Sequence, residues 1–344
     1  MQRTTLEDVA EHAGVSIKTV SRVVNKEPNV RQATLEKVSK AIAELNYRPN
    51  LSARNLASKR SHLICLIYDD PAAYELPSSG YIIKMQEGVL KACKTNNYDL
   101  LIHPCNYRDK HISSEIRSLI DHARPDGIIV AAPLSNTPRI TKAIEATGTP
   151  LVGLSPGIKT RSHSTISTND SDVSAQMVEY LVSLGHKEIA FIQGDSGHKA
   201  VASRFDGYKA GLKAAGIPLS QSLVISGDNS IGSGELAGMK LLKRKQRPTA
   251  IFAANDDMAL GVMRSAKKLG IDIPGEVSIA GYDDITLARL VYPALTTVSQ
   301  PLATMAERAA MFLIDRNGEQ HEVIRSEIIP GHIQVRESTG KPPH

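Results

Sequence analysis

Apolar residues follow two different spacings along the chain, and the change near His62 divides it into a head and a body. Before His62, apolar positions recur every three to four residues, as on one face of an α-helix. After it, short continuous apolar runs alternate with polar loops and amphipathic stretches. This pattern predicts an all-α head, followed by a body of parallel β-sheets that carry helices on both faces.

Three short helices are predicted in the head. Thr5 caps the first helix and forms a capping box with Asp8. Gly14 interrupts that helix, and Ser16 begins the second one. The third helix runs over residues 32–45, and its apolar stripe is expected to face the core with Leu35, Val38, Ile42 and Leu45.

The body is too long for one typical sheet, so two doubly wound lobes are predicted. Its apolar runs, each typical of a buried parallel strand, are HLICLIY, YDLLIH, GIIVAA, PLVGL, EIAFIQG, TAIFAAN and VSIAGYDD. The terminal STGKPPH is expected to fray. The expected divisions are residues 1–49 for the head, 50–61 for a linker and 62–344 for the body, with a first lobe at about 62–160 and 292–322 and a second at about 163–290 and 323–340.

The net charge of +5 lies entirely in the first 60 residues, which hold 11 of the 41 Lys and Arg residues but six of the 36 Asp and Glu residues. A basic head on a neutral body indicates an acidic partner for the head alone. No run approaches the roughly 18 apolar residues of a membrane span. The amino end also lacks the apolar stretch of a signal peptide, so we expect a cytoplasmic protein without a membrane partner.

The cysteines and histidines do not have the spacings of disulfide frameworks or metal sites. Cys65, Cys93 and Cys105 are an odd number without a CxxC motif, and we expect buried thiols. The eleven histidines include no HExxH pattern. We therefore expect no metal or other cofactor.

The segment from Leu6 to Asn25 has the pattern of a helix-turn-helix. Ala10 is small enough for two helices to cross, and Gly14 suits a turn with positive φ. An ordinary helical hairpin is the alternative, but its outer face need not be basic. Here the second helix carries a polar and basic outward face, made of Ile17, Lys18, Ser21, Arg22 and Asn25.

The chain resembles the LacI/GalR family of bacterial transcriptional regulators. The resemblance begins with LEDVAEHAGVSIKTVSRVVN and ELNYRPN and extends along nearly the whole chain. Its further motifs, in order, are LGH, SRFDGY, PTAIFAANDDMALG, VSIAGYDD and LTTVSQP. The resemblance implies a helix-turn-helix head and a body like the type I periplasmic binding proteins.

The resemblance also implies roles in DNA binding. Ile17, Lys18 and Arg22 are expected at base edges, since an arginine fork matches guanine O6 and N7. Leu56 resembles the family's minor-groove wedge, with a plain packing leucine as the alternative. The linker is expected to form a helix only when paired with its twin on DNA. The expected phosphate contacts are Thr5, Ser16, Ser21, Asn25 and Tyr47. Arg31 stands where many relatives carry a capping hydroxyl, so that cap is expected to be weaker.

In the body, effectors of such proteins are expected at the strand ends between the lobes. An arginine and a carboxylate there can satisfy several hydroxyl groups, with a structural ion pair between Arg204 and Asp283 as the alternative. Thr168 and Asn229 stand where many relatives offer an aromatic ring, which favours a small hydroxylated effector over a purine. The expected effector residues are Asp69, Asp70, Tyr81, His198, Arg204, Asn255, Asp283 and Gln300.

These features predict a ligand-responsive repressor of carbohydrate catabolic genes that binds a palindromic operator on double-stranded DNA as a homodimer. No apolar heptad run follows Val335, which favours a dimer over a tetramer. A sugar-binding protein and a doubly wound enzyme are the alternatives. The GDSG of residues 194–197 resembles a protease loop but has no identifiable Asp/His partners, and residues 232–238 lack true GxGxxG spacing. We therefore expect no enzyme activity.

Overall fold

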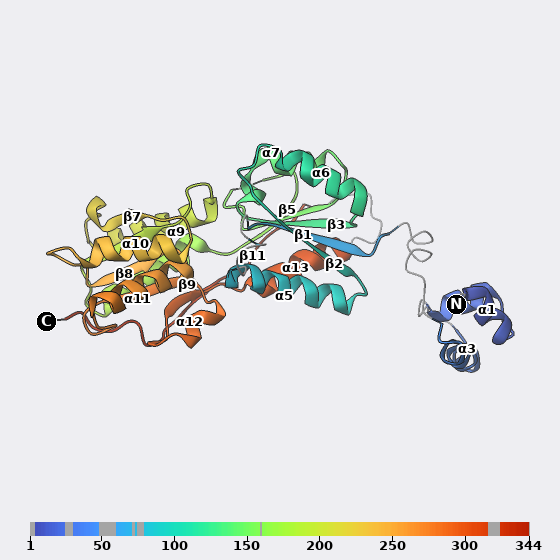
Figure 1. Ribbon diagram of the computed structural model, residues 1–344. Helices are drawn as coiled ribbons and strands as arrows, with labels where there is room; N and C mark the ends of the chain where they lie inside the picture. Colours follow the sequence, from blue (N-terminus) through green and yellow to red (C-terminus); the bar gives the residue numbers. More distant parts are fainter. Residues whose placement is uncertain are drawn as a thin grey trace. The chain divides into compact units, whose positions relative to one another are not determined.

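The computed structural model describes residues 4–24, 30–47, 60–70, 73, 79–158, 160–315 and 324–343. The chain forms two compact units, Met1–Ser61 and His62–His344, drawn with their elements in Figure 1. Asn25, Leu56 and most of the 50–61 linker lie outside the described residues, so their predicted roles stay predictions.

Three helices build the head around a small core. They are α1 (Leu6–His12), α2 (Ile17–Val24) and α3 (Gln32–Glu44). Val9, Val20 and Val38 contribute one fully buried side chain from each helix. The predicted stripe on α3 is wrong at one position, because Leu35 is exposed and Ala41 is buried in the core instead. Within the described head, α1 and α2 are too short to cover the first turn of α3, where Leu35 lies.

The first lobe of the body has a parallel six-stranded sheet in the order β11-β5-β4-β3-β1-β2. Alternate residues of its first strand face opposite sides: Ile64 packs toward α5 and α13, and Cys65 packs toward α6 and α7. Figure 1 shows these two helix pairs on the two faces of the sheet. The strands are β1 (Leu63–Asp69), β2 (Asp99–Cys105), β3 (Gly127–Ala131), β4 (Leu151–Leu154), β5 (Ser164–Ser167) and β11 (Ser326–Ile328). The helices are α5 (Gly80–Thr95), α6 (Ile112–Ala123), α7 (Pro138–Glu145) and α13 (Leu302–Ile314), with a 3₁₀ turn at Leu134–Asn136.

The second lobe repeats this plan in the order β12-β10-β9-β8-β6-β7, with only β12 antiparallel to its neighbour. Two helix pairs, α8 with α9 and α10 with α11, cover it. The strands are β6 (Ile189–Gln193), β7 (Val224–Ser226), β8 (Ala250–Ala253), β9 (Ser278–Asp283), β10 (Thr296–Ser299) and β12 (His332–Gln334). The helices are α8 (Asp170–Ser183), α9 (Lys199–Ala214), α10 (Ile231–Leu242), α11 (Asp256–Leu269) and α12 (Thr286–Leu290), with a 3₁₀ turn at Gln221–Leu223.

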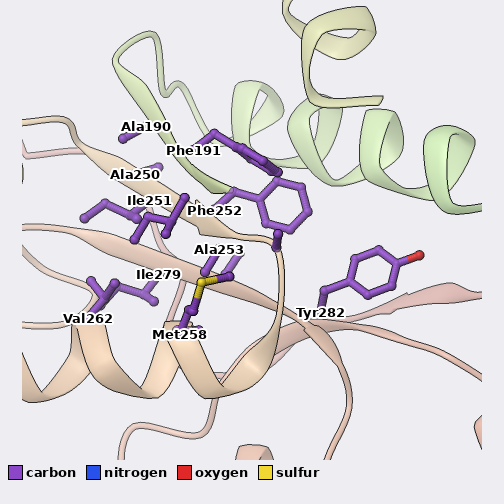
Figure 2. Packing of buried hydrophobic residues seen from close by; sticks show 14 of the residues in the cluster. Ala190, Phe191, Ala250, Ile251, Phe252, Ala253, Met258, Val262, Ile279 and Tyr282 are labelled. Carbon is purple, nitrogen blue, oxygen red and sulfur yellow. The ribbon is translucent and has the colours of Figure 1, made fainter. Parts of the chain in front are cut away.

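Continuous apolar strands make the core of the second lobe. Phe191 on β6 stacks on Tyr208, with ring centroids 4.8 Å apart, and meets Phe252 edge to face at 5.3 Å. Figure 2 shows Phe191 beside Phe252, with Tyr282 toward the end of β9. The rigid core therefore fixes where each strand ends, and the candidate site is built at those ends.

The chain passes between the lobes three times, each time later than predicted. β5 lies in the first sheet and β10 in the second, so the first two crossings fall at residues 168–169 and 300–301. β11 also lies in the first sheet, which puts the third crossing at 329–331. The prediction failed because these strands are only three or four residues long and rich in Ser and Thr, without a long apolar run.

The carboxyl tail packs against the second lobe, so the expectation of a frayed STGKPPH segment is wrong for residues up to 340. Ser338 is fully buried. Its hydroxyl donates to the Ile279 carbonyl at 2.6 Å and accepts from the Thr296 amide at 2.8 Å. Because buried backbone groups of β9 and β10 would otherwise lack hydrogen-bond partners, these bonds to Ser338 hold the tail in place.

Candidate functional site

The first helix of the head is fixed by the predicted capping box. The Thr5 hydroxyl accepts from the Asp8 amide at 3.3 Å, and the Asp8 carboxylate accepts from the Thr5 amide at 2.7 Å. The Thr5 amide, and second the Thr5 hydroxyl at 2.8 Å, donate to the Asp8 carboxylate and lower the pKa of Asp8. The prediction of this cap is confirmed, and the cap satisfies backbone N–H groups at the start of α1.

The second helix presents the residues expected to read DNA. Gly14 turns the chain with φ +56°, and the Ser16 hydroxyl accepts from the Thr19 amide at 3.2 Å at the start of α2. Val20 and Val23 then pack inward. On the outer side Ile17 is 47% exposed and Lys18 is exposed, while Arg22 is half-buried. An apolar group that is half in water at the start of a helix suits contact with a thymine methyl.

The residues expected at phosphates differ in exposure. Thr5 and Ser16 are exposed and Ser21 is half-buried. Tyr47 is only 7% exposed and packs in the head core, so its expected phosphate contact stays a prediction. Arg31 begins α3 without a side-chain capping bond, as predicted from its departure from the family pattern.

In the body, a buried arginine lies at the centre of the strand ends. The Arg204 guanidinium donates through Nε to Asp170 at 3.0 Å, and through Nη1 to Asp283 at 3.3 Å and to the Ala254 carbonyl at 2.5 Å. Its Cζ lies 3.8 Å from the centre of the Tyr282 ring, whose hydroxyl donates to Asp170 at 2.9 Å. We call Arg204, Asp170, Tyr282 and Asp283 the Arg204 cluster.

Burial raises the pKa of both carboxyl groups of this cluster, Asp170 and Asp283. The pKa of Asp283 rises to about 7, although Arg204 and a hydrogen bond from Gln300 oppose the rise. The Gln300 amide nitrogen donates to Asp283 at 2.5 Å. The backbone of Asp283 is also unusual, with φ +117°, because the strand turns sharply as it leaves the sheet. Asp283 and Gln300 are therefore brought together as the sequence predicted.

Asn255 serves mainly as a helix cap. Its amide oxygen accepts from the Met258 amide at 2.9 Å, and its amide nitrogen donates to the Asn229 carbonyl at 2.9 Å. The residue sits at the start of α11, beside the Arg204 cluster, but both ends of its amide are already used. Any effector contact by Asn255 would have to use the second amide hydrogen.

The predicted residues of the first lobe occupy two places. Asp69 ends β1 and accepts from the Tyr107 amide at 2.8 Å; burial raises its pKa. Asp70 follows, with its amide donating to the Cys105 carbonyl at 2.9 Å. Tyr81 lies in the first turn of α5, where burial and then the charge of Asp283 raise its pKa. Tyr81 thus faces the Arg204 cluster from the other lobe, whereas Asp69 lies toward β2.

Four buried polar atoms at this interlobe site have no hydrogen-bond partner among the described residues. They are Asn136 Oδ1, Ser155 Oγ, His198 Nδ1 and Gln300 Oε1. Burial, followed by the charge of Arg204, lowers the pKa of His198 to about 3, so its ring is neutral at physiological pH. Buried polar groups left unpaired cost free energy, which a ligand with hydroxyl groups would recover.

Three of the residues at this site were not predicted. Asp170, Ser155 and Asn136 lie in short polar segments without a distinctive motif. Ser155 has φ +45°, which would have marked it as special, but backbone strain cannot be read from residue types. Within the described residues no group of acidic, cysteine and histidine side chains could hold a metal ion.

Comparison with known proteins identifies the family. A model described as bacterial regulatory proteins, lacI family, matches residues 5–50, and one described as periplasmic binding protein-like domain matches residues 178–339. Catabolite control protein A of Priestia megaterium is 33% identical over 340 residues, which cover 97% of this chain and 99% of that protein. The chain belongs to the LacI family. It is therefore a DNA-binding transcriptional regulator with an effector-binding domain, and LacI-family regulators are not enzymes.

Solved structures agree with this LacI-family assignment over the full length. A lac repressor dimer bound to operator and the anti-inducer ONPF is 29% identical, with a TM-score of 0.78 over 98% of this chain and 100% of that one. The complex of the regulator CelR with cellobiose is 30% identical, with a TM-score of 0.74 over the same shares. The predicted fold class, a helical head with two doubly wound lobes, is confirmed. In the described part of this regulator, no helix is long and apolar enough to cross a membrane.

Proposed function

We propose that this LacI-family regulator is a cytoplasmic repressor of carbohydrate catabolic genes whose affinity for a palindromic operator is set by a sugar or sugar derivative. The observation that carries the proposal is the Arg204 cluster with the four unpaired polar atoms around it. Together they offer charged donors, a carboxylate and neutral acceptors around one site. Sugar hydroxyl groups both donate and accept, so they match such a mixture.

The head would read the operator through α2. Arg22 and Lys18 donate to guanine, and Ile17 packs on a thymine methyl. Thr5, Ser16, Ser21 and the Tyr47 hydroxyl hold phosphates and so fix the register. Asn25 at a phosphate and Leu56 in the minor groove complete the proposal, although both lie outside the described residues. Each half of a palindrome needs one such head, with centres about 34 Å apart.

Exposed apolar side chains support a homodimer built by the body. Ile83 and Leu90 lie on α5, and Leu287, Leu290 and Tyr292 lie on or beside α12. Tyr292 is 92% exposed, which is unusual for so large a ring in a monomer. The lac repressor structure to which this chain is similar is a dimer. In the proposed dimer, these two surfaces pack against their copies and bring the twin linkers together.

The effector would act by favouring one arrangement of the two lobes. A ligand that holds them closed moves the first lobes and changes the spacing of the linkers, which alters DNA affinity. The predicted residues Asp69, Asp70, Tyr81, His198, Arg204, Asn255, Asp283 and Gln300 would hold it. Ser155 and Asn136 join this set because their buried oxygens are unpaired.

The test is a thermal-shift screen of the full chain against monosaccharides, disaccharides including cellobiose, and purines, followed by operator anisotropy with each hit. We expect a sugar to raise the melting temperature and to change operator affinity in one direction. Gln300→Leu should lower the affinity for that sugar by at least tenfold, since the substitution removes both the amide donor to Asp283 and the unpaired Oε1. Gln221→Leu, at an exposed position in the second lobe, is the matched control. A purine hit with no sugar hit would refute the proposal.

A further inference from the structure

The two lobes are bonded to each other at one edge by side chains that no predicted site includes. The Tyr107 hydroxyl, in the loop after β2, donates to Asp195 in the loop after β6 at 3.0 Å. The neighbouring Arg108 donates through Nη2 to both Asp195 oxygens, at 2.9 and 2.8 Å. Arg108 Nε also donates to the Tyr107 hydroxyl at 3.0 Å, which closes a three-residue network.

The loop that receives these bonds is shaped to fit them. A Cβ at Gly197 would lie 2.2 Å from the Tyr107 hydroxyl, so only glycine leaves room for the ring. The Gly197 amide donates to Asp195 at 2.9 Å, and its carbonyl accepts from Asn136 at 3.1 Å. These residues belong to the GDSG segment, 194–197, whose likeness to a protease loop has no chemical basis here. Its glycine and aspartate instead serve contact with the first lobe.

The network lies at the edge of the body away from the three crossings. In the first sheet β5 and β11 stand at one end and β2 at the other, and in the second sheet β10 and β12 stand at one end with β6 and β7 at the other. At about 4.8 Å per strand, β2 is about 19 Å from β5 and β6 is about 14 Å from β10. A rotation of about 10° about the crossings would therefore part the two loops by about 3 Å, enough to break the three hydrogen bonds to Asp195 that join the lobes.

We propose that Tyr107, Arg108 and Asp195 form a latch that holds the lobes closed over the effector site, with the crossings as the hinge. The latch also positions a predicted effector residue, because the Tyr107 amide holds the Asp69 carboxylate. It rests on the proposed function only in that the site it closes is the proposed effector site. The rate of latch opening therefore sets an upper limit on the rate at which the effector binds and on the rate at which it dissociates.

Exposure makes the latch weak enough to open. The Arg108 side chain is 65% exposed, whereas that of Asp195 is 15% exposed. An ion pair open to water on one side is screened by salt, so opening should become more frequent as ionic strength rises. The buried Arg204 pairs, in contrast, are shielded from that screening.

Hydrogen–deuterium exchange of the full chain without effector or DNA tests the latch. The informative peptides cover residues 194–203 and 104–110, which contain the bonded Gly197 and Tyr107 amides. Tyr107→Phe and Arg108→Ala should each speed exchange in both peptides by at least threefold, with peptides of β3 and β8 unchanged. The wild type should show the same acceleration between about 50 mM and 500 mM salt, and Arg108→Ala should not.

Two matched controls and a double variant decide between a latch and a merely structural role. Arg117→Ala removes an exposed arginine from the same lobe, and Tyr180→Phe removes a hydroxyl bonded within the second lobe. Asp195→Asn keeps an oxygen for the Gly197 amide, and combining it with Arg108→Ala should add nothing to either single effect. Exchange equal to the controls, additive effects, or acceleration that extends into β3 and β8 would each overturn the latch. No effector is present, so this result is independent of whether a sugar binds.

Discussion

The pKa values of two carboxyl groups in the second lobe are shifted in opposite directions, because only one of the two accepts hydrogen bonds that outweigh the effect of burial. Burial raises the pKa of Asp257, at the start of α11, to about 6. Burial acts on Asp228 too, but hydrogen bonds from Ser230 and Ser233 outweigh it and lower that pKa. A carboxyl with a raised pKa opposes folding once it must ionise, whereas one with a lowered pKa favours folding in its ionised form.

We predict that Asp257→Asn stabilises the protein at pH 8 and leaves it unchanged at pH 4. The folded state keeps the Asp257 proton up to about pH 6 and the unfolded state loses it near 3.8, so stability falls as pH rises across that window. The substitution removes this ionisation and should stabilise the folded state at pH 8 by up to about 3 kcal/mol, because one pKa unit corresponds to about 1.4 kcal/mol. Urea unfolding at both pH values measures it.

Asp228→Asn is the control of opposite sign. It should lose stability at pH 8 and lose progressively less as pH falls, because the ionised form is the one held by hydrogen bonds. Equal effects of the two variants at pH 8 would contradict the assignment of both shifts.

At the scale of elements, what was predictable depended on how local the signal was. The Thr5–Asp8 cap and the Gly14 turn are encoded within a few residues, and both are found as predicted. The late crossings and the packed tail depend on pairing between distant segments, such as Ser338 with Ile279. In the effector site, Arg204 and Asp283 could be inferred from family motifs, whereas Ser155 gains its place only through the turn after β4.

We predict that Gly14→Ala destabilises the head by about 1 kcal/mol and weakens operator binding. The added Cβ would lie 3.4 Å from Lys37 Nζ, an ordinary contact, so the cost comes from φ +56°. Gly148→Ala is a matched control in the body, with φ +73° and open space around it. It should lower stability similarly without changing DNA affinity in an anisotropy titration; a loss of operator binding by both variants would argue against a specific role of the turn.

At the scale of the whole molecule, the positive charge of the head allows base contacts to be distinguished from phosphate contacts by their dependence on salt. All of the net +5 lies in residues 1–60, and the Lys40 ammonium forms a solvent-exposed pair with Glu44 at 3.8 Å. Each phosphate contact contributes a slope of about −0.9 to the dependence of log affinity on log salt. A base contact contributes specificity and leaves that slope almost unchanged.

We predict that Arg22→Ala costs about 1 to 3 kcal/mol at one base pair of the operator and preserves the salt slope. The measurement is anisotropy with a set of single-substitution operators at several salt concentrations. A uniform loss over all operators, with a slope reduced by about one, would instead make Arg22 a phosphate contact.

The three crossings of the body also govern how such a regulator can change in evolution. Because the chain passes between the lobes at 168–169, 300–301 and 329–331, neither lobe is one continuous stretch of the gene. A single recombination point within the part of the gene that encodes the body therefore produces at least one lobe assembled from two different parents. Effector preference is most safely exchanged by replacing residues 62–344 as one block, while the head and its operator preference can be inherited separately.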